Sequence, residues 1–536
     1  MLTIILTNRS TTMSAASMIA LLGGTLLFPS HYLYSQESGA IVVREVRHAV
    51  SAPLREINDP PAAAESDMDQ GEPEDKIFEV KKDSQAEHVP SFDPALQSGA
   101  ALAPSSVQGI SFQGLSTAGR VVPDTNGAAG ATQYMQWANA QVAIYAKATG
   151  KRLLIGQGNR FWAGLGGPCQ TTNPNDGVIL YDKIAARWVV SHYAGTGPYF
   201  QCVAVSTSTD ATGSYYQYAF SLPTTNFTDY GKIATWSDAY YVSINLLNQN
   251  DNFEPVGGLV CALQRAKMLA GESATAQCFT TSVANMSLLP ADLDGTTAPP
   301  TGAPNFLLDL STDALNLWKF HVNWQTPSLS TLTGPTKIAV SAFSEACGGG
   351  QCIPQPPPET GTSSLLDSLA DRLMHRLSYR NFGTHQSLVA THSVNPPTNA
   401  WSAIRWYEIR NPGGTPTVYQ QGTFAPDQKS RWMPSIAMDQ SGDIAVGYSV
   451  SSNLVNPGIR YAGRLSTDPL GTLETEVNIV IGNGVQTTTY RWGDYSGMSV
   501  DPADECTFWY TNQYLPTTGD FNWTTKITSF KFPSCQ

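Results

Sequence analysis

The chain has 536 residues and a formal net charge of −12, with 14% charged residues, 45 Gly, 35 Pro and 10% aromatic residues. Its acidic balance excludes a protein that wraps nucleic acid, because such proteins carry a basic surplus. Many turn formers and aromatics with few charges are typical of an all-β protein rather than a helical one.

Residues 1–35 have the layout of a secretory signal peptide. Arg9 precedes an apolar run over Met18–Phe28, which is too short to span a bilayer. We expect cleavage near Ser35 or Ala40. No later segment approaches the roughly 18 apolar residues of a membrane span, so we predict no transmembrane segment. The sequence therefore predicts a secreted protein, in the extracellular space, in the periplasm or at the cell surface.

Residues 36–105 are predicted to be a disordered acidic linker or pro-segment. Within them, residues 41–100 hold 13 Asp and Glu but only 6 Lys and Arg, and short Pro and Ala runs interrupt the chain. Such a segment has too little apolar surface to bury against itself.

The remaining residues, 106–536, are predicted to form one β-propeller domain. Seven segments repeat the same order: a polar turn, a short strand, a second turn and an aromatic-rich strand. Their spacing suits four-stranded blades with insertions, so we predict seven blades, with six or eight as alternatives. The segments begin near Asp124, Asp176, Asp229, Asn305, Tyr379, Pro434 and Asp494. Leu365–Leu377 is predicted to be helical, and Lys526–Phe532 is expected to help close the ring.

Eight cysteines, all after residue 168, are an even number in a chain predicted to be exported, and so predict disulfides. The first, second and fourth of the pairs below would close loops of tens of residues, each worth roughly 3 kcal/mol in the loop-entropy model. Zinc is not favoured, because no Cys-x-x-Cys pair occurs. Sequence proximity favours Cys169–Cys202, Cys261–Cys278, Cys347–Cys352 and Cys506–Cys535.

Two turns resemble a longer version of the sialidase Asp box, Ser-x-Asp-x-Gly-x-Thr-Trp. They are Ser208–Ser214 and Ser466–Thr472. The resemblance implies hairpins on the outer side of a propeller, not a catalytic site. The segments Pro123–Gly127, Arg372–Gly383 and Arg491–Pro502 resemble a family of secreted bacterial β-propeller proteins without an assigned reaction. That resemblance covers nearly all of the predicted domain and implies fold and export, but no catalytic residue.

Three arginines each lie close to the start of a repeat: Arg380, Arg431 and Arg491. If they converge at one mouth of the ring, their planar guanidiniums form a clamp for the acid group of a sugar. Trp432 and Trp492 then offer faces on which sugar rings stack. The alternative is structural: the arginines join neighbouring blades through ion pairs, and the tryptophans pack between blades.

Acid–base chemistry on such a sugar needs two titratable groups near one bond. We predict His385 or Asp494 as the base and Tyr495 as the acid. The alternative is that the Asp caps a strand and the His is a hydrogen-bonded blade residue. Asp124 and Asn126 carry oxygen ligands that suit Ca²⁺, although they lack the EF-hand loop; no other cofactor is expected.

The sequence thus predicts a protein that acts on or binds an extracellular acidic carbohydrate. As an enzyme it would be a glycoside hydrolase of sialidase-like type or a polysaccharide lyase. The alternative is a non-catalytic binding or adhesion module, or a cell-surface scaffold. The expected partner is an extracellular glycan or cell-surface ligand, with the protein a monomer. No HExxH, Gly-x-Ser-x-Gly, P-loop or dinucleotide-binding glycine motif occurs.

Overall fold

The computed structural model describes residues 39–59, 92–99, 101–172, 176–397 and 401–536. The all-β prediction is confirmed, since antiparallel strands build the described part and its helices are short. The predicted signal peptide lies outside the described residues. Within the described ranges, no helix is long and apolar enough to cross a membrane.

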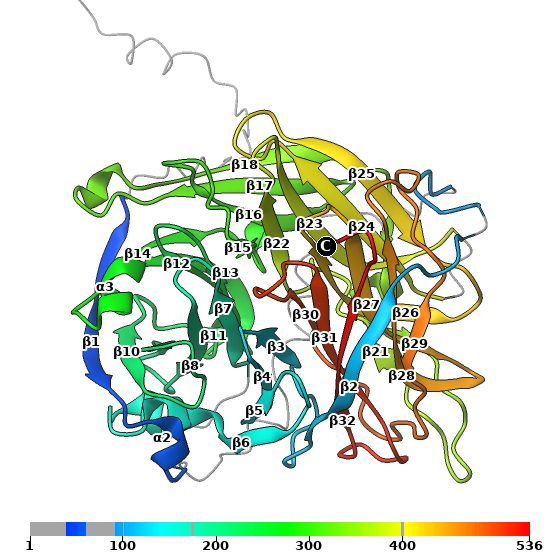
Figure 1. The fold of residues 1–536 in the computed structure, drawn as a ribbon, viewed down its shortest axis with the longest axis horizontal. Helices are drawn as coiled ribbons and strands as arrows, with labels where there is room; N and C mark the ends of the chain where they lie inside the picture. Colours follow the sequence, from blue (N-terminus) through cyan, green and yellow to red (C-terminus); the bar gives the residue numbers. More distant parts are fainter. Residues whose placement is uncertain (1–38, 60–91, 100, 173–175, 398–400) are drawn as a thin grey trace, which may run out of the picture. The chain divides into compact units, whose positions relative to one another are not determined.

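Antiparallel pairing links the described strands in groups of four, called units 1 to 7 below (Figure 1). Residues 41–50 join units 2 and 3 into one nine-stranded sheet, and a parallel pairing between Ala291–Asp294 and Leu377–Arg380 joins units 4 and 5 into another. Units 1 to 4 consist of β3 (Asn126–Ala129), β4 (Gln133–Ala138), β5 (Gln141–Ala146) and β6 (Arg152–Gln157); β7 (Val178–Asp182), β8 (Arg187–Ala194), β9 (Phe200–Ser206) and β10 (Tyr215–Ser221); β11 (Phe227–Thr235), β12 (Tyr240–Asn248), β13 (Glu254–Leu263) and β14 (Thr275–Thr281); and β15 (Leu289–Asp294), β16 (Asn305–Ser311), β17 (Ala314–His321) and β18 (Thr331–Ala339). Units 5 to 7 consist of β22 (Leu377–Asn381), β23 (Gln386–Asn395), β24 (Ala403–Arg410) and β25 (Thr417–Phe424); β26 (Ser430–Met438), β27 (Ile444–Ser452), β28 (Val455–Arg464) and β29 (Val477–Val480); and β30 (Gly497–Val500), β31 (Thr507–Tyr514), β32 (Thr524–Lys531) and β2 (Val107–Ser116).

The first strands of the seven units form a closed ring. Each of β3, β7, β11, β15, β22, β26 and β30 contacts the next in this order, and β30 contacts β3. Unit 7 takes three strands from the C-terminal end and its outermost strand, β2, from near the N-terminus. The expected role of the last strand in closing the ring therefore agrees with the pairing of β32 and β2 in Figure 1.

Most ring units share a backbone feature in or just before the first strand. Six of the seven have one residue in the left-handed region, four of them before the first strand and two within it, and Asp and Asn are tolerated in this region better than other non-glycine residues. These residues are Asp124, Asp176, Tyr230, Ser287, Met433 and Asp494. The predicted start of the fourth unit at Asn305 is wrong, because Asn305 begins the second strand and Ser287 marks the first. Ser287 has no aspartate beside it, so the repeat pattern in the sequence did not reveal this position.

The predicted helix over Leu365–Leu377 is wrong. The chain there forms the two-residue strand β21 (Leu366–Asp367) and then bends, and residues 366–380 are all buried. The polar residues that suggested a solvent-facing side of a helix are paired inside the protein, as Asp371 with Arg372 at 2.7 Å. The apolar residues of this segment are therefore spaced as in a helix, although no side of the segment is exposed to water.

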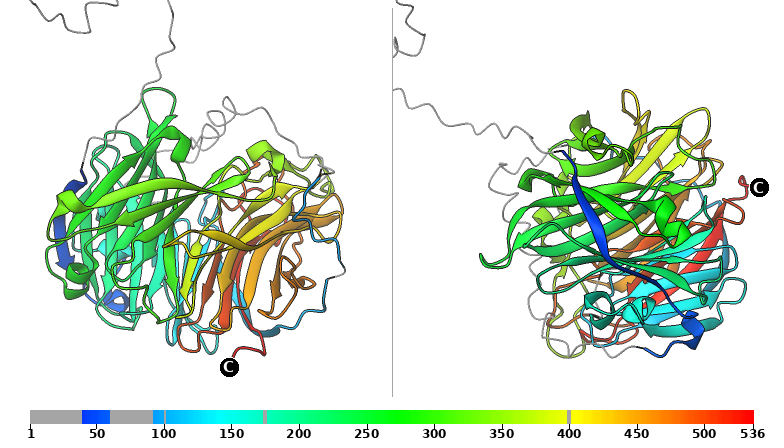
Figure 2. Two further views of the ribbon diagram at one scale, coloured as in Figure 1. Left: turned by 90° about the horizontal axis from the view of Figure 1, so that it is seen from above. Right: turned by 90° about the vertical axis from the view of Figure 1, so that its left-hand side faces the viewer.

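The prediction of disorder over residues 36–105 is wrong where the structure describes them. β1 (Ile41–Val50) lies along the outer strands of two neighbouring units, with its first half on β14 and its second half on β10. Figure 2 shows it crossing both edges. Its alternating apolar residues suit a strand, and an open sheet edge offers it unpaired backbone groups. Residues 60–91 lie outside the described part.

A belt, defined here as residues 41–59, 92–99 and 101–106, continues this cover around the ring. After β1, Arg55 pairs with Asp210 at 3.0 Å in the first Asp-box-like turn. Further on, Asp93 pairs with the buried Arg405 of unit 5 at 2.7 Å. Ser105 then donates its N–H to a glutamate of unit 6 before the chain enters β2. The belt thus ties units together from outside. Both Asp-box-like turns connect the third and fourth strands of their units.

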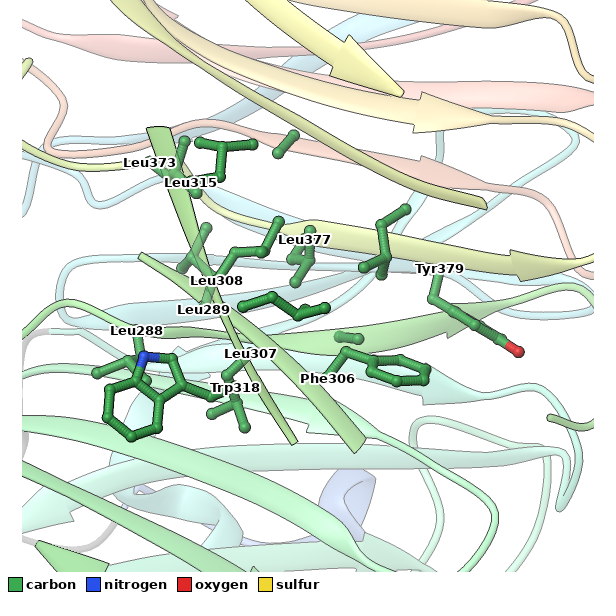
Figure 3. Packing of buried hydrophobic residues seen from close by; sticks show 14 of the residues in the cluster. Leu288, Leu289, Phe306, Leu307, Leu308, Leu315, Trp318, Leu373, Leu377 and Tyr379 are labelled. Atoms are coloured by element: carbon green, nitrogen blue, oxygen red, sulfur yellow. The ribbon is translucent and has the colours of Figure 1, made fainter. Parts of the chain in front are cut away.

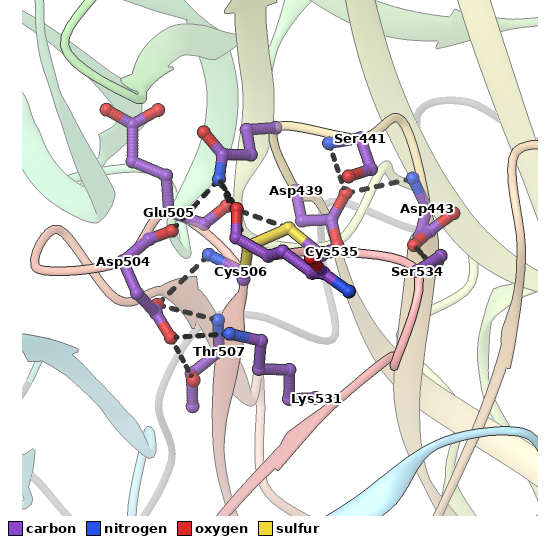
Figure 4. Close-up of a disulfide and its surroundings, with 12 residues drawn as sticks. Asp439, Ser441, Asp443, Asp504, Glu505, Cys506, Thr507, Lys531, Ser534 and Cys535 are labelled. Carbon is purple, nitrogen blue, oxygen red and sulfur yellow. Dashed lines mark hydrogen bonds and ion pairs between the residues drawn. A yellow bond between two sulfur atoms is a disulfide. The ribbon is translucent and has the colours of Figure 1, made fainter.

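All four predicted disulfides are confirmed: Cys169–Cys202, Cys261–Cys278, Cys347–Cys352 and Cys506–Cys535. The last ties the segment after β32 to the β30–β31 turn (Figure 4). The largest apolar cluster packs units 3, 4 and 5 together, with Phe306, Trp318 and Leu377 among its members (Figure 3).

Short elements fill the connections. They are the helices α2 (Pro168–Thr171) and α3 (Arg265–Ala270), the 3-10 turns η2 (Leu54–Glu56), η3 (Gly158–Trp162), η4 (Val283–Asn285), η5 (Pro327–Leu329) and η6 (Ala346–Gly349), and the strands β19 (Ser344–Glu345) and β20 (Gln351–Ile353).

Candidate functional site

Charged side chains from three units meet inside the ring. The segment 367–376 leads into β22 and places Arg376 between two carboxylates of β15. Its Nη1 donates to Asp292 Oδ2 at 3.1 Å, its Nη2 to Asp294 Oδ2 at 2.7 Å, and its Nε to the Met498 carbonyl at 3.0 Å. Burial alone would raise the pKa of Asp294, but Arg376 and further cations hold it below its ordinary value. This group is a buried, mutually neutralised ion network.

A second group of side chains lies at the start of the first strands. Asp176 accepts hydrogen bonds from the hydroxyls of Tyr193 at 2.6 Å and Tyr495 at 3.1 Å. The Lys232 ammonium lies 3.5 Å from the centroid of the Tyr230 ring and 4.2 Å from that of Tyr495. Burial and then the Asp176 carboxylate raise the pKa of Tyr495 well above its ordinary value, so it stays a neutral phenol.

Two more titratable residues border this second group. Burial and the Asp176 carboxylate raise the pKa of Asp229 to about 6, although Arg372 and Lys232 oppose the shift. Burial, then Lys232 and the next arginine, hold the pKa of His375 well below its ordinary value, so its imidazole is neutral at pH 7. These residue types suit acid–base chemistry, but they are covered by protein on all sides: both are at least 97% buried.

The predicted anion clamp is not formed. Each of the three guanidiniums is bound to a different carboxylate: Arg380 to Glu505 at 2.8 Å, Arg431 to Glu476 at 2.8 Å, and Arg491 to Asp494. The alternative that the arginines join neighbouring units does not describe these pairs either, because Arg431 and Arg491 pair within their own units and Arg380 of unit 5 pairs with a carboxylate of unit 7.

The strand register shows why Arg380 and Arg431 stay apart. Arg380 Nε donates to the carbonyl of Met438 at 3.0 Å, so Arg380 lies beside the end of β26. Arg431 stands near the start of β26, seven residues earlier, which is roughly 20 Å along an extended strand. Their similar position close to a repeat start therefore did not correspond to one level in the ring.

Of the two predicted bases, only Asp494 lies beside the predicted acid, Tyr495. His385 lies in the turn between β22 and β23, half-buried, with its ring stacked on Phe382 at 4.7 Å between centroids. Asp494 and Tyr495 precede β30, at the other end of the first strands. The structure does not bring His385 and Tyr495 together, because the length of a strand separates them, so of the predicted pairs only Asp494 with Tyr495 lies at one place in the ring.

The two tryptophans predicted as stacking surfaces are fully buried. Trp432 and Trp492 pack against each other with ring centroids 5.7 Å apart, and Trp492 Nε1 donates to Ser449 Oγ at 3.0 Å. They join units 6 and 7, as the structural alternative expected.

The residues predicted to suit Ca²⁺ already have protein partners. Asn126 Oδ1 accepts the N–H of Ile179 at 2.9 Å, and Asp124 Oδ2 accepts Asn139 at 2.5 Å. Among the described residues, no group of three His, Cys, Asp or Glu side chains is arranged to hold a metal ion.

A surface cleft lies at the seam between unit 7 and unit 1. It has a volume of about 370 Å³, with β2 on one side and β5 and β6 on the other. Its lining includes the amides of Gln113 and Gln141, the hydroxyls of Ser116 and Thr117, and one charged side chain, Arg152. Neutral hydrogen-bonding groups with a single cation are typical of a binding site for a polar ligand.

Hydrogen bonds join the two units behind this cleft, next to its lining residues Gly114 and Leu115. Gln136 of unit 1 accepts the N–H of Leu115 at 2.9 Å and donates to the hydroxyls of Thr511 at 2.7 Å and Thr525 at 2.9 Å in unit 7. At Gly114 a Cβ would come within 2.5 Å of the Gln136 amide and the Thr525 hydroxyl. Glycine at this position therefore allows the close approach of the two units.

Sequence reasoning missed His375, Arg376, Lys232 and Arg152. The first two lie in the segment taken for a helix, whose exposed face was assumed to be solvated. Lys232 belongs to a repeat start where attention fell on Asp229. Nothing in the local sequence around Arg152 distinguishes it from an ordinary strand-end arginine; only the pairing of β2 with β32 creates the seam beside it.

Comparisons with protein-family models and with curated proteins find no match. Among solved structures, the chain is similar to an α-L-arabinofuranosidase from Fusarium graminearum, with 9% identity and a TM-score of 0.34 over 82% of this chain and 99% of that one. It is also similar to a neuraminidase-like protein of a flat-faced bat influenza virus from Peru (11%, 0.33, 70% and 97%). A third is the extracellular part of Drosophila semaphorin 1a (8%, 0.32, 80% and 89%). Likenesses this weak assign no activity.

Proposed function

We propose that this protein is an exported, monomeric seven-bladed β-propeller that binds an extracellular acidic carbohydrate without cleaving it. The blade number is supported by seven consecutive four-stranded units whose first strands close a ring. Export is supported by four disulfides, which persist in oxidising compartments.

The observation that carries the choice of binding over catalysis is the contrast between interior and surface. An enzyme needs two titratable groups that reach one bond of its substrate. Inside the ring, the acids and bases neutralise one another out of contact with water, as Arg376 does with Asp292 and Asp294. The seam cleft is open to solvent, and its lining has one charged side chain among amides and hydroxyls.

The test uses purified mature protein and a panel of acidic and neutral polysaccharides. Binding, new reducing ends and the ultraviolet absorbance of unsaturated uronate are followed together. We expect binding to acidic members with neither product signal. New reducing ends alone would show hydrolysis and both signals would show β-elimination; either result overturns the proposal. Absence of binding to every member overturns it as well.

A further inference from the structure

We propose that the seam cleft between β2 and β6 is the carbohydrate site, and that Arg152 binds the acid group of a terminal sugar. This assignment rests on the proposed function and adds its location and the residue that selects for charge. The ligand's acid group is a uronate carboxylate or a sulfate ester, both of which match a planar guanidinium.

Arg152 differs from the arginines of the ring interior in its surroundings. Its side chain is exposed, and no ion pair joins it to any carboxylate of the described residues. By contrast, Arg380 and Arg431 are buried and each holds a carboxylate at 2.8 Å. Because no carboxylate of the described residues occupies this guanidinium, its donors are available to a ligand, and it loses little by exchanging water for a carboxylate.

Arg152 is also held in place by its strand. It stands opposite Tyr145 in the β5–β6 ladder, and the Tyr145 ring packs on Phe112 of β2 with centroids 5.1 Å apart. Cross-strand partners project from the same face of a sheet, so Arg152 lies beside this aromatic pair, which joins β5 to β2. The pair fixes the strand that carries Arg152 relative to the opposite wall of the cleft.

The rest of the lining suits the hydroxyl groups of a sugar. Ser116 Oγ lies 2.7 Å from Thr524 Oγ1, and Gln113 Nε2 donates to the same hydroxyl at 3.2 Å. Hydroxyl and amide groups both donate and accept, so they can exchange partners with ligand hydroxyls. Ile155, also in the lining, offers an apolar surface to a sugar ring. About 370 Å³ is at the small end of ligand sites, enough for the end of a glycan rather than a long stretch.

The experiment measures Kd by calorimetry for short oligogalacturonides, for the same oligomers as methyl esters, and for sulfated galactan oligomers. Arg152→Ala is compared with Arg152→Lys and with Arg44→Ala, a matched control at another exposed arginine without a carboxylate partner, on β1. We expect Arg152→Ala to weaken binding of the acidic oligomers at least about tenfold, the usual worth of a hydrogen bond to a charged group. The methyl ester should bind the wild-type protein as weakly as the acidic oligomer binds the Arg152→Ala variant.

Arg152→Lys keeps the charge without the planar fork, so we expect an intermediate loss, and Arg44→Ala should match wild type. Tighter binding of the carboxylate or of the sulfate oligomers identifies the acid group. Unchanged affinity in Arg152→Ala, with wild type still binding acidic oligomers, overturns the site while leaving the proposed function intact. No binding by wild type overturns both. Thermal unfolding of each variant confirms that it is folded.

Discussion

Replacing Asp93 by alanine should strongly destabilise the whole protein, although this residue lies in a stretch whose composition indicated disorder. Asp93 is 3% exposed and Arg405 is fully buried. Asp93 Oδ1 accepts Arg405 Nη2 at 2.7 Å, and its Oδ2 accepts the Thr423 hydroxyl at 2.7 Å. Removing the carboxylate leaves a buried guanidinium without its counter-charge, which costs about 3–5 kcal/mol in the free energy of unfolding.

The assay is urea unfolding followed by tryptophan fluorescence, with calorimetry alongside. For a chain this long, about 1–2 °C per kcal/mol is expected, so the melting temperature should fall by roughly 5 °C. Glu56→Ala is the matched control in the same belt: its side chain is 64% exposed and its nearest cation is Arg55 at 3.9 Å, so it should change stability by less than about 0.5 kcal/mol. The double variant Asp93→Ala with Arg405→Leu should recover part of the loss. An unfolding free energy for Asp93→Ala within about 1 kcal/mol of wild type would refute the reasoning that the belt is an integral part of the fold.

Three further changes test other parts of the structure. Replacing Cys506 and Cys535 by serine should lower the unfolding free energy by roughly 3.6 kcal/mol, and replacing Cys347 and Cys352 by roughly 2 kcal/mol. The first loss is larger because the first pair closes a longer loop, with a sequence separation of 29 against 5. Equal losses in urea unfolding would contradict this. Gly295→Ala places a Cβ 2.5 Å from Arg380 Nη1 at φ +77°, whereas the Cβ of Gly302→Ala, at φ +75°, has open space around it. Both variants are strained by the positive φ, so Gly295→Ala should show the larger loss of stability by calorimetry because of the added clash. Similar losses in the two variants would mean that backbone strain alone explains them and that the clash adds nothing. Burial and then the neighbouring Asp443 raise the pKa of Asp439 to about 7, so this carboxyl favours the fold most below about pH 4 and loses that contribution as pH rises toward 7. Asp439→Asn should therefore flatten the fall in the unfolding free energy between pH 5 and pH 8. An unchanged slope in the variant would show that the group does not titrate in this range.

The elements that were predictable from sequence are those fixed by short-range chemistry. Cys261 and Cys278 lie directly opposite each other on adjacent strands of one unit, so sequence proximity was a sound guide to their pairing. Asp at a repeat start carries a local signal because it tolerates the left-handed backbone found at Asp124 and Asp494.

The candidate site was less accessible to sequence reasoning, because ion pairing in this fold joins residues far apart in the chain. Arg380 forms an ion pair with Glu505, which lies 125 positions later in the chain, and no motif near either residue indicates this pairing. Aspartates and arginines at repeat starts looked like one converging set, but register along the strands put them at different levels. The cleft could not be foreseen for a related reason: its two walls come from units that are neighbours only when the ring is closed.

The strand order of unit 7 has a consequence for the order of events during synthesis. β2 is synthesised before the strands of units 1 to 6, and its partner β32 is synthesised after all of them. Until β32 is available, β2 has no neighbour in its own sheet, and the wall that β2 contributes to the seam cleft is missing. The cleft is therefore completed only after β32 has been synthesised, and ligand binding at this position would report that β2 and β32 have been joined.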